Sequence, residues 1–504
     1  MFTPEYPKVW EIAEILDRIV EESDVLNKTG ERMLENRQKI AESMAGFGLI
    51  EAERFVWRII EADAVNGKRV IFDPAAREEM LLDAKEQAVR RAGGILQLYR
   101  EEKVSNEEKE SNAKKDSQND KLGGMKRLKD WVDDADIRME DSSKYARTRG
   151  VPALKGVLLC GVPGCGKSET VKVIHRKWGL PMLRLDVDQL MGGLVGDSER
   201  NMRQALAQAE AMAPCILWID ELEKGFSGAA SESRDGGTFK RMFGRLLTWM
   251  QENQKPCFIC ATANDISNLP PEFFRSGRFD VLFSFYMPTN DECKEIFAEQ
   301  MRRADKLRRD KAKELGSSEK DIKPLFNEDS QMGCFTDRAL QNIMNLFTEK
   351  KDPEHPEGIK FLTGADIRKI TSAALTRLPA EKLNKPLEES DWIDVLSKVV
   401  SDSAITTLGS GNASLDMIAA NYVRLMRQNF VPVSEDRQLL FKKENYKCEY
   451  KDDPNTGKVK VIAKYDGGCT LSSPYDRALF NALHSRIERI AGMIENAGLL
   501  RISQ

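Results

Sequence analysis

The chain has 504 residues, a length typical of several domains rather than one. Hydrophobic residues make up 41% and charged residues 31%, and the net charge is −4, which is typical of a globular protein and lacks the basic excess of nucleic-acid or anionic-membrane binders. No apolar run reaches the ~18 residues of a membrane-spanning helix, and the first ten residues lack a signal-peptide pattern, so we expect a cytoplasmic protein, or a stromal one if the chain works in a plastid.

The first 100 residues are predicted to form a helical domain. Apolar residues recur there at helical spacing, first at Ile12, Ile15, Leu16 and Ile19, and again at Phe55, Val56, Ile59 and Ile60. Residues 101–121 are almost entirely charged and polar, and such a segment buries too little apolar surface to order itself. We therefore expect a flexible linker over 101–121.

Residues 122–287 are predicted to form an α/β domain. Short apolar runs at 157–159, 182–185, 215–219 and 258–261 alternate with helical stretches, which is typical of a doubly wound parallel sheet covered on both faces. Residues 288–408 are predicted to be helical. Residues 409–504 are predicted to be a small α+β extension.

The extension is expected to contain a β-hairpin and a terminal helix. The hairpin strands are 446–450 and 459–463, joined across a turn-forming Asp-Asp-Pro-Asn-Thr-Gly. The helix carries an apolar face and is expected to pack against the protein, with a partner site as the alternative. Its apolar residues are Leu479, Leu483, Ile487 and Ile490.

A phosphate-binding loop runs from Gly161 to Ser168. It has the form GxxxxGK[ST], follows an apolar strand and opens a helix. Its glycines allow backbone N–H groups to approach phosphate oxygens, Lys167 is expected to reach the β- and γ-phosphates, and the Ser168 hydroxyl to bind Mg²⁺. The residues expected to line the nucleotide here are Gly161, Pro163, Gly164, Cys165, Gly166, Lys167, Ser168 and Glu169.

Two later strands end in polar residues. Asp220 and Glu221 follow the apolar run 215–219, which predicts Asp220 as a second magnesium ligand and Glu221 as the carboxylate that polarises the attacking water. Asn264 follows the next strand and is predicted to position that water or sense the γ-phosphate, with a turn-capping role as the alternative.

Arg275 and Arg278 lie three residues apart around a glycine. They are too far along the chain to reach their own phosphates easily. Planar guanidinium groups stabilise the charge of phosphoryl transfer, so the pair is predicted to act on the nucleotide of a neighbouring subunit.

Cysteine and histidine chemistry is not indicated. Cys257 and Cys260 form a CxxC inside an apolar strand with no second pair, so we expect reduced core residues. The three histidines are far apart, and the chain contains no HExxH, which argues against a fused zinc protease.

From about residue 122 to 375 the chain resembles an AAA+ ATPase of the AAA subgroup that carries the second region of homology. The resemblance implies a P-loop NTPase core with a helical lid. Lys167 and Ser168 match Walker A, Asp220 and Glu221 Walker B, Asn264 sensor 1, and Arg275 and Arg278 the arginine fingers. Two segments resemble those that contact adenine, Leu122-Gly123 and Gly364-Ala365, and Arg368 just after the second is expected to have a surface or structural role.

Within the subgroup, residues 183–199 and 216–221 look like the uncharacterised AAA ATPases of chloroplast and cyanobacterial genomes. The pattern departs from threading motors, because Leu194, after Gly192 and Gly193, stands where a pore aromatic is expected. Residues 250–253 also replace an Asp-Gly-Phe that links subunits in the subgroup. The N-terminal helices are interpreted either as a helical adaptor or as the lid of a degenerate AAA+ module.

The resemblance implies ATP and Mg²⁺ as cofactors and a homo-oligomer, with a hexameric ring as the expected assembly. The leading hypothesis is an ATP-driven remodeller of protein substrates or complexes. The alternative is a nucleotide-switched ATPase that docks a protein partner without threading it. Nucleic-acid handling is disfavoured by the acidic balance, and no membrane partner is expected.

Overall fold

The structure is a computed structural model, and it describes most of the chain. The predicted linker 101–121, the segment with Gly192, Gly193 and Leu194, and the first residues of the predicted extension 409–504, up to 414, lie outside the described residues. The described residues are 6–22, 37–66, 74–91, 95–100, 122–140, 154–191, 197–227, 235–267, 269–314, 337–348, 361–378, 389–401, 415–428, 430–434, 446–452, 459–465 and 473–502.

A seven-stranded sheet forms the centre of the molecule, in the order β1-β3-β4-β5-β2-β6-β7. Its strands from β2 to β7 pair in parallel, which confirms the predicted α/β sheet. All four predicted apolar runs are strands, and each is buried almost throughout. The strands are β1 (Leu96–Leu98), β2 (Gly156–Gly161), β3 (Met182–Leu185), β4 (Cys215–Ile219), β5 (Cys257–Ala263), β6 (Val281–Phe285) and β7 (Val431–Pro432).

The two edge strands come from segments that the sequence assigned elsewhere. β1 belongs to the expected N-terminal helical domain but pairs antiparallel with β3, Leu96 opposite Leu185. β7 belongs to the expected C-terminal extension but pairs with β6, Phe283 opposite Val431. Strands of two or three residues are too short to show an alternating apolar pattern, so the sequence does not reveal them.

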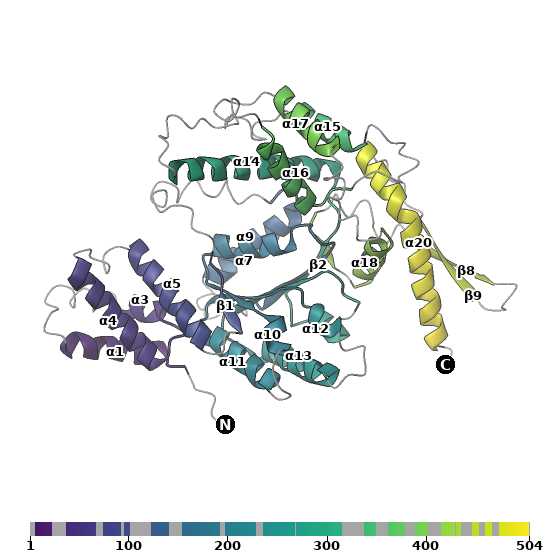
Figure 1. The fold of residues 1–504 in the computed structure, drawn as a ribbon. Coiled ribbons are helices and arrows are strands. Elements are labelled where there is room, and N and C mark those ends of the chain that lie inside the picture. The colour runs from purple at the N-terminus through teal and green to yellow at the C-terminus, as the bar shows by residue number, and fades with distance from the viewer. Residues whose placement is uncertain are drawn as a thin grey trace.

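Helices cover both faces of the sheet (Figure 1). On one face Trp131 and Trp178 pack on Phe258 of β5, with ring centroids 6.3 and 4.8 Å apart. This face carries α7 (Lys126–Glu140) and α9 (Lys167–Trp178), and the other carries α10 (Val187–Met191), α11 (Asp197–Ala211), α12 (Lys224–Ser227) and α13 (Asp235–Glu252).

The N-terminal helices have an apolar cluster of their own, separate from that of the sheet. The predicted stripe is confirmed, since Ile12, Leu16 and Ile19 are fully buried. The helices lie beside the β1 edge (Figure 1). They are α1 (Val9–Glu22), α3 (Arg37–Ser43), α4 (Leu49–Asn66) and α5 (Pro74–Arg91).

Beyond the sheet lies a second group of helices, which fall within residues 288–408, the range predicted to be helical: α14 (Asn290–Glu314), α15 (Asp337–Thr348), α16 (Gly364–Thr376) and α17 (Glu389–Ser401). The remaining elements are α18 (Leu415–Arg427), β8 (Tyr446–Asp452), β9 (Val459–Tyr465) and α20 (Pro474–Ile502). β8 and β9 pair antiparallel as predicted. Leu479, Leu483 and Ile487 are buried, so this face of α20 packs within the chain. None of the described helices is long and apolar enough to cross a membrane.

Candidate nucleotide-binding and catalytic site

The loop between β2 and α9 has the backbone of a phosphate cradle. Gly161, Gly164 and Gly166 all have positive φ, at 144°, 77° and 100°. At Gly161 an added Cβ would lie 2.0 Å from the Phe285 carbonyl oxygen, so only glycine fits there. Gly166 is also the N-cap of α9 and has no side chain to cap the helix, which leaves the first N–H groups available to an anion.

Lys167 is folded onto its own loop. Its Nζ donates to the carbonyl oxygens of Gly161 and Val162, both at 2.9 Å, and the residue is only 6% exposed. Burial lowers the pKa of this ammonium, and the nearby Cys165 and Cys160 thiols oppose that shift. The two carbonyl oxygens stabilise the buried charge of Lys167. Phosphate oxygens would stabilise it more strongly, because hydrogen bonds between two charged groups are stronger than those to a neutral acceptor.

The start of α16 touches the phosphate loop directly. The Ala365 N–H donates to the Gly164 carbonyl at 3.1 Å. Thr363 and Asp366 form a capping box that fixes this helix end, and a Cβ on Gly164 would lie 2.9 Å from the Thr363 hydroxyl. The structure therefore brings Gly364 and Ala365 to the phosphate loop, their contact with adenine stays a prediction, and Arg368 is exposed.

Residues 122–125 lie between the loop and α14. The Gly124 N–H donates to Glu295 at 2.6 Å, and a Cβ on Gly123 would lie 2.7 Å from the Ile296 backbone nitrogen. Met125 has a φ of 57°, and its Cε would lie 2.9 Å from a Cβ on Gly166. Leu122 is buried, and the segment bridges the phosphate loop and the lid.

Asp220 receives donors on both carboxylate oxygens. Oδ1 accepts from Thr262 Oγ1 at 2.6 Å and from Ser168 Oγ at 3.3 Å, and Oδ2 pairs with Arg184 at 3.3 Å. The Arg184 guanidinium also lies 4.9 Å from the centre of the Trp218 ring. A hydroxyl and a carboxylate thus meet beside the phosphate loop, which is the oxygen donor set that Mg²⁺ prefers.

Glu221 and Asn264 face each other. Asn264 Nδ2 donates to Glu221 Oε1 at 3.4 Å, and Lys224 pairs with the other oxygen of that carboxylate. Glu221 has a φ of 52°, a conformation that costs a non-glycine residue about 1 kcal/mol or more and that recurs at functional sites. Its N–H donates to Thr262 Oγ1 at 3.0 Å, so Thr262 holds both acidic residues.

Glu169 connects α9 to the lid. It accepts from Arg303 of α14 at 2.7 Å and pairs with Arg176 at 3.5 Å. Burial raises the pKa of its carboxyl, but the hydrogen bond and charge of Arg303 outweigh burial, and the net shift is downward. Glu169 is therefore engaged in an ion pair between core and lid.

Arg275 and Arg278 lie away from the phosphate loop. They follow the 3₁₀ helix η4 (Pro271–Phe274), and Asp280 just beyond them accepts from the N–H groups of Lys155 and Gly156 at 2.6 and 2.9 Å. Those residues begin β2, whereas the loop follows its other end, about 17 Å away at strand rise. The Arg275 side chain is 69% exposed, and Arg278 donates to the Glu272 carbonyl.

Several side chains in this site were not predicted. Threonine is common in strands, so the sequence does not distinguish Thr262 as a functional residue. The structure shows that it is buried, with 1% of its surface exposed. The pattern of β3 predicts only that Arg184 faces outward. Its contact with Asp220 depends on the register of β3 and β4, which the sequence does not give. Glu223 belongs to no motif in the sequence, yet its carboxylate accepts from the Asn264 N–H at 2.9 Å. Burial raises the pKa of this carboxyl.

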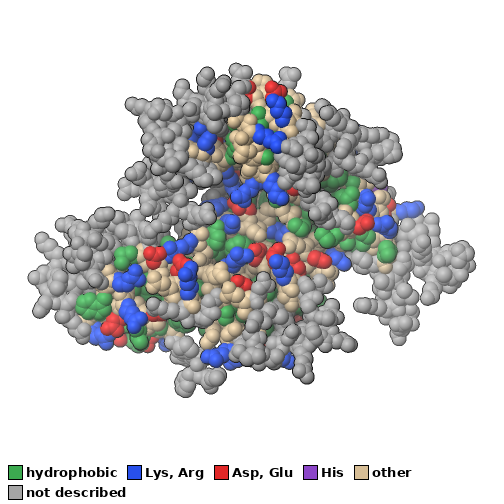
Figure 2. Space-filling model, in the orientation of Figure 1, with side chains coloured by type: hydrophobic (Ala, Val, Ile, Leu, Met, Phe, Trp, Pro, Cys, Tyr) green, Lys and Arg blue, Asp and Glu red, His purple; other side chains and the backbone are tan. Residues whose placement is uncertain are grey.

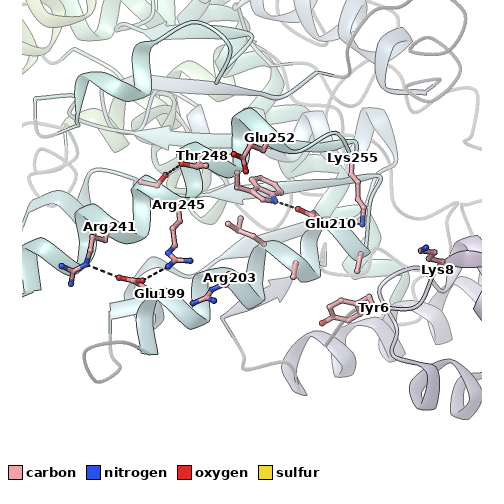
Figure 3. A pocket seen from close by; sticks show the side chains of 15 residues that line it. Tyr6, Lys8, Glu199, Arg203, Glu210, Arg241, Arg245, Thr248, Glu252 and Lys255 are labelled. Carbon is pink, nitrogen blue, oxygen red and sulfur yellow. Dashed lines mark hydrogen bonds and ion pairs between the residues drawn. The ribbon is translucent and has the colours of Figure 1, made fainter. Parts of the chain in front are cut away.

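A groove of about 1020 Å³ lies elsewhere, between the N-terminal segment and helices α11 and α13 (Figure 3). Glu199 on its wall pairs with Arg241 and Arg245 at 3.2 and 3.1 Å, and Glu210 accepts from Trp249 at 2.5 Å. No residue of the phosphate loop lines it. The size of this groove therefore does not mark it as the nucleotide site.

The cysteines behave as expected of core residues. Cys257 and Cys260 are free and buried in β5, and burial raises the pKa of Cys260. Within the described residues, no three His, Cys, Asp or Glu side chains are grouped so as to hold a metal ion.

Comparison with known proteins matches residues 157–287 to the family "ATPase family associated with various cellular activities (AAA)". A curated relative, the uncharacterized AAA domain-containing protein ycf46 of Guillardia theta, is 47% identical over 35% of this chain and 34% of its own length. The protein of the same name from Pyropia yezoensis is 35% identical over 57% of this chain and 52% of its own. The matched region thus spans about half of these relatives or less.

Among solved structures, the crystal structure of the FIGL-1 AAA domain covers 65% of this chain and 93% of that chain, with 15% identity and a TM-score of 0.39.

Proposed function

Because residues 157–287 form a domain of the AAA ATPase family, we propose that the chain binds and hydrolyses ATP at the site around Lys167. The observation that carries this proposal is the convergence of Ser168, Asp220, Glu221 and Asn264 at one sheet edge, linked through Thr262. These side chains come from three separate stretches of the chain. A purely structural loop has no need of them together.

The phosphates would be held by the backbone of the loop and by Lys167. Backbone N–H groups from Gly164 to Ser168 supply donors, and Lys167 would exchange its two carbonyl partners for phosphate oxygens. Ser168 and Asp220 would hold the magnesium ion, which, when bound, neutralises phosphate charge. Their observed mutual hydrogen bond supports this assignment, since both oxygens already face one point.

Glu221 would orient the attacking water and take up its proton, and Asn264 would fix the direction of that carboxylate. The adenine would lie between residues 122–125 and the start of α16. Its predicted contacts are Leu122, Gly123, Gly364 and Ala365. Pro163, which has no N–H, would shape the loop, Cys165 would contribute its backbone N–H, and the Glu169 side chain would support the site through its pairing with Arg303.

We further propose a homo-oligomeric, hexameric ring in which Arg275 and Arg278 act on the neighbour's nucleotide. Their attachment to the opposite end of β2 from the phosphate loop supports action between subunits. In such a ring the chain would remodel a protein substrate. Basic and acidic side chains are interspersed over the described part of the face in Figure 2, which gives no support to a nucleic-acid substrate.

The test uses the Glu221→Gln variant, which should bind ATP and hydrolyse it at least about 100-fold more slowly. Size-exclusion chromatography with light scattering in ATP and Mg²⁺ is expected to give a ring-sized species. A persistent monomer under these conditions would overturn the ring.

Leu194→Ala distinguishes the proposed threading remodeller from a nucleotide-switched docking ATPase. A threading remodeller loses substrate-dependent work in this variant, whereas a docking ATPase keeps partner binding.

A further inference from the structure

Helix α18, in the C-terminal part of the chain, contacts Asn264, which directly follows strand β5. Asn421 Nδ2 donates to the Asn264 carbonyl at 2.6 Å, and Arg424 pairs with the Asp265 carboxylate at 3.1 Å. These contacts bring together residues that are more than 150 positions apart in sequence. They join a segment that the sequence placed in a separate extension to the residue expected to read the γ-phosphate.

The Asn264 backbone is thereby held on both sides. Its N–H donates to Glu223 at 2.9 Å, and its carbonyl accepts from Asn421. Glu223 is 8% exposed and Asn421 6% exposed, so both bonds are shielded from water, where hydrogen bonds are strongest. The two bonds fix the backbone from which the Asn264 side chain extends, and that side chain donates to Glu221 Oε1 at 3.4 Å.

α18 is itself held rigidly against the core. The Tyr422 hydroxyl accepts from the Met287 N–H at 2.8 Å, and its ring lies 4.5 Å from that of Tyr286. Tyr422 is fully buried, and the chain after the helix adds β7 to the sheet. A residue on α18 therefore has the fixed position that a support for a catalytic group needs.

We propose that Asn421 is a positioning residue for ATP hydrolysis, which sets Asn264 against Glu221 from the C-terminal segment. The inference rests on the proposed function, since it assigns Asn421 a role only through Asn264. Asn421 would act through the Asn264 backbone and would not itself contact the reacting atoms. The C-terminal segment is then part of the ATPase rather than an appended module.

The experiment is a double-mutant cycle in the full-length chain, with Asn421→Ala, Asn264→Ala and the double variant. Asn421→Ala is expected to lower kcat about tenfold, because small displacements of catalytic groups cost about that or more, and to leave the affinity for a fluorescent ADP analogue within about twofold. The double variant is expected to be no slower than Asn264→Ala alone. A purely structural role would instead give losses that add.

Asp416→Asn is the matched control. Asp416 lies on the same helix but pairs with Arg489 of α20 at 2.6 Å rather than with the strand end at Asn264, so kcat should be unchanged. Thermal unfolding shows whether Asn421→Ala folds. If it does not, Arg424→Gln takes its place, because it removes the partly exposed ion pair between Arg424 of α18 and Asp265, the residue after Asn264, without opening a cavity. Additive losses, or unchanged kcat in Asn421→Ala and Arg424→Gln, would overturn the inference. If wild type and Glu221→Gln hydrolyse ATP at the same rate, the proposed function fails instead.

Discussion

Thr262 connects the two acidic residues of the site. It donates to Asp220 and accepts from the Glu221 N–H, and its own side chain is almost fully buried. The positive φ of Glu221 needs such an external support, because a strained backbone persists only when its surroundings hold it. A hydroxyl at this position does what no carboxylate could do, since it is donor and acceptor at once.

Thr262→Val should therefore slow hydrolysis about tenfold or more and reduce stability by about 1–3 kcal/mol, because it leaves a buried N–H without its acceptor. Steady-state ATPase assays and urea unfolding measure the two effects. Thr248→Val is the control, since Thr248 is exposed on α13 and its hydroxyl donates to the Gly244 carbonyl four residues earlier. Equal behaviour of the two variants would contradict this role for Thr262.

Asp476 lies where α20 meets the start of α14. It accepts from the Asn290 N–H at 3.0 Å, and burial raises the pKa of its carboxyl from 3.8 to about 6, with added repulsion from Asp291 and Glu292. A raised carboxyl pKa means that the folded state holds the proton more tightly. Stability contributed by the protonated form is thus lost as pH rises from about 4 through about 6.

Asp476→Asn should remove this loss, since the amide oxygen can still accept from Asn290. We expect the variant to be more stable than wild type above pH 6 by about 1–2 kcal/mol, a value reduced for partial solvent screening, and the difference to shrink toward pH 4. Urea unfolding at pH 5 and pH 7.5 measures it. A difference that does not vary with pH would show that the carboxyl does not titrate in this range.

At the scale of elements, the phosphate loop and α16 form one contact. Gly164 and Ala365 share a backbone hydrogen bond, and the capping box at Thr363 fixes the helix end that makes it. A nucleotide bound in the loop would therefore touch core and lid together. This close approach depends on the absence of a Cβ at Gly164.

Gly164→Ala should weaken ADP binding at least about tenfold, because the new Cβ meets the Thr363 hydroxyl and the backbone already has a positive φ. Gly179→Ala is the matched control: Gly179 also has a positive φ, but nothing lies within 4 Å of its Cβ position. It should lose about 1 kcal/mol of stability and keep its nucleotide affinity. Titration with a fluorescent ADP analogue compares them, and equal affinity losses would contradict the close-approach argument.

The sequence predicts the elements that carry strong local patterns. Short apolar runs predict β2 to β5, and the glycine-rich loop predicts the start of α9, because each of these patterns is contained within a few consecutive residues. Residues such as Asn421 and Arg184 have no local pattern. Their contacts arise from strand register and from a helix that returns after a gap of more than 100 residues, and only the folded chain fixes these.

At the scale of the whole molecule, distant parts of the described chain meet at the sheet that carries the candidate nucleotide site. Segments from the N-terminal part, the lid and the C-terminal part all join the sheet or its carboxyl edge. The division at 100, 287 and 408 remains a prediction, although β1 and β7 show that the sheet recruits strands from both sides of it. In the part of the chain that the structure describes, Arg275 and Arg278 lie beside the start of β2, at the opposite end of that strand from the phosphate loop.

Mixing two variants tests whether a neighbouring subunit completes each nucleotide site. Lys167→Ala keeps the arginines but loses the phosphate contact, and Arg278→Ala keeps the phosphate loop but loses a neighbour's arginine. Each alone should be almost inactive, and an equimolar mixture should recover roughly a quarter of the wild-type rate per site, since random ring assembly pairs an intact loop with an intact arginine at that frequency. A mixture no faster than the sum of its parents, or full activity of Arg278→Ala alone, would contradict a site completed by a neighbouring subunit.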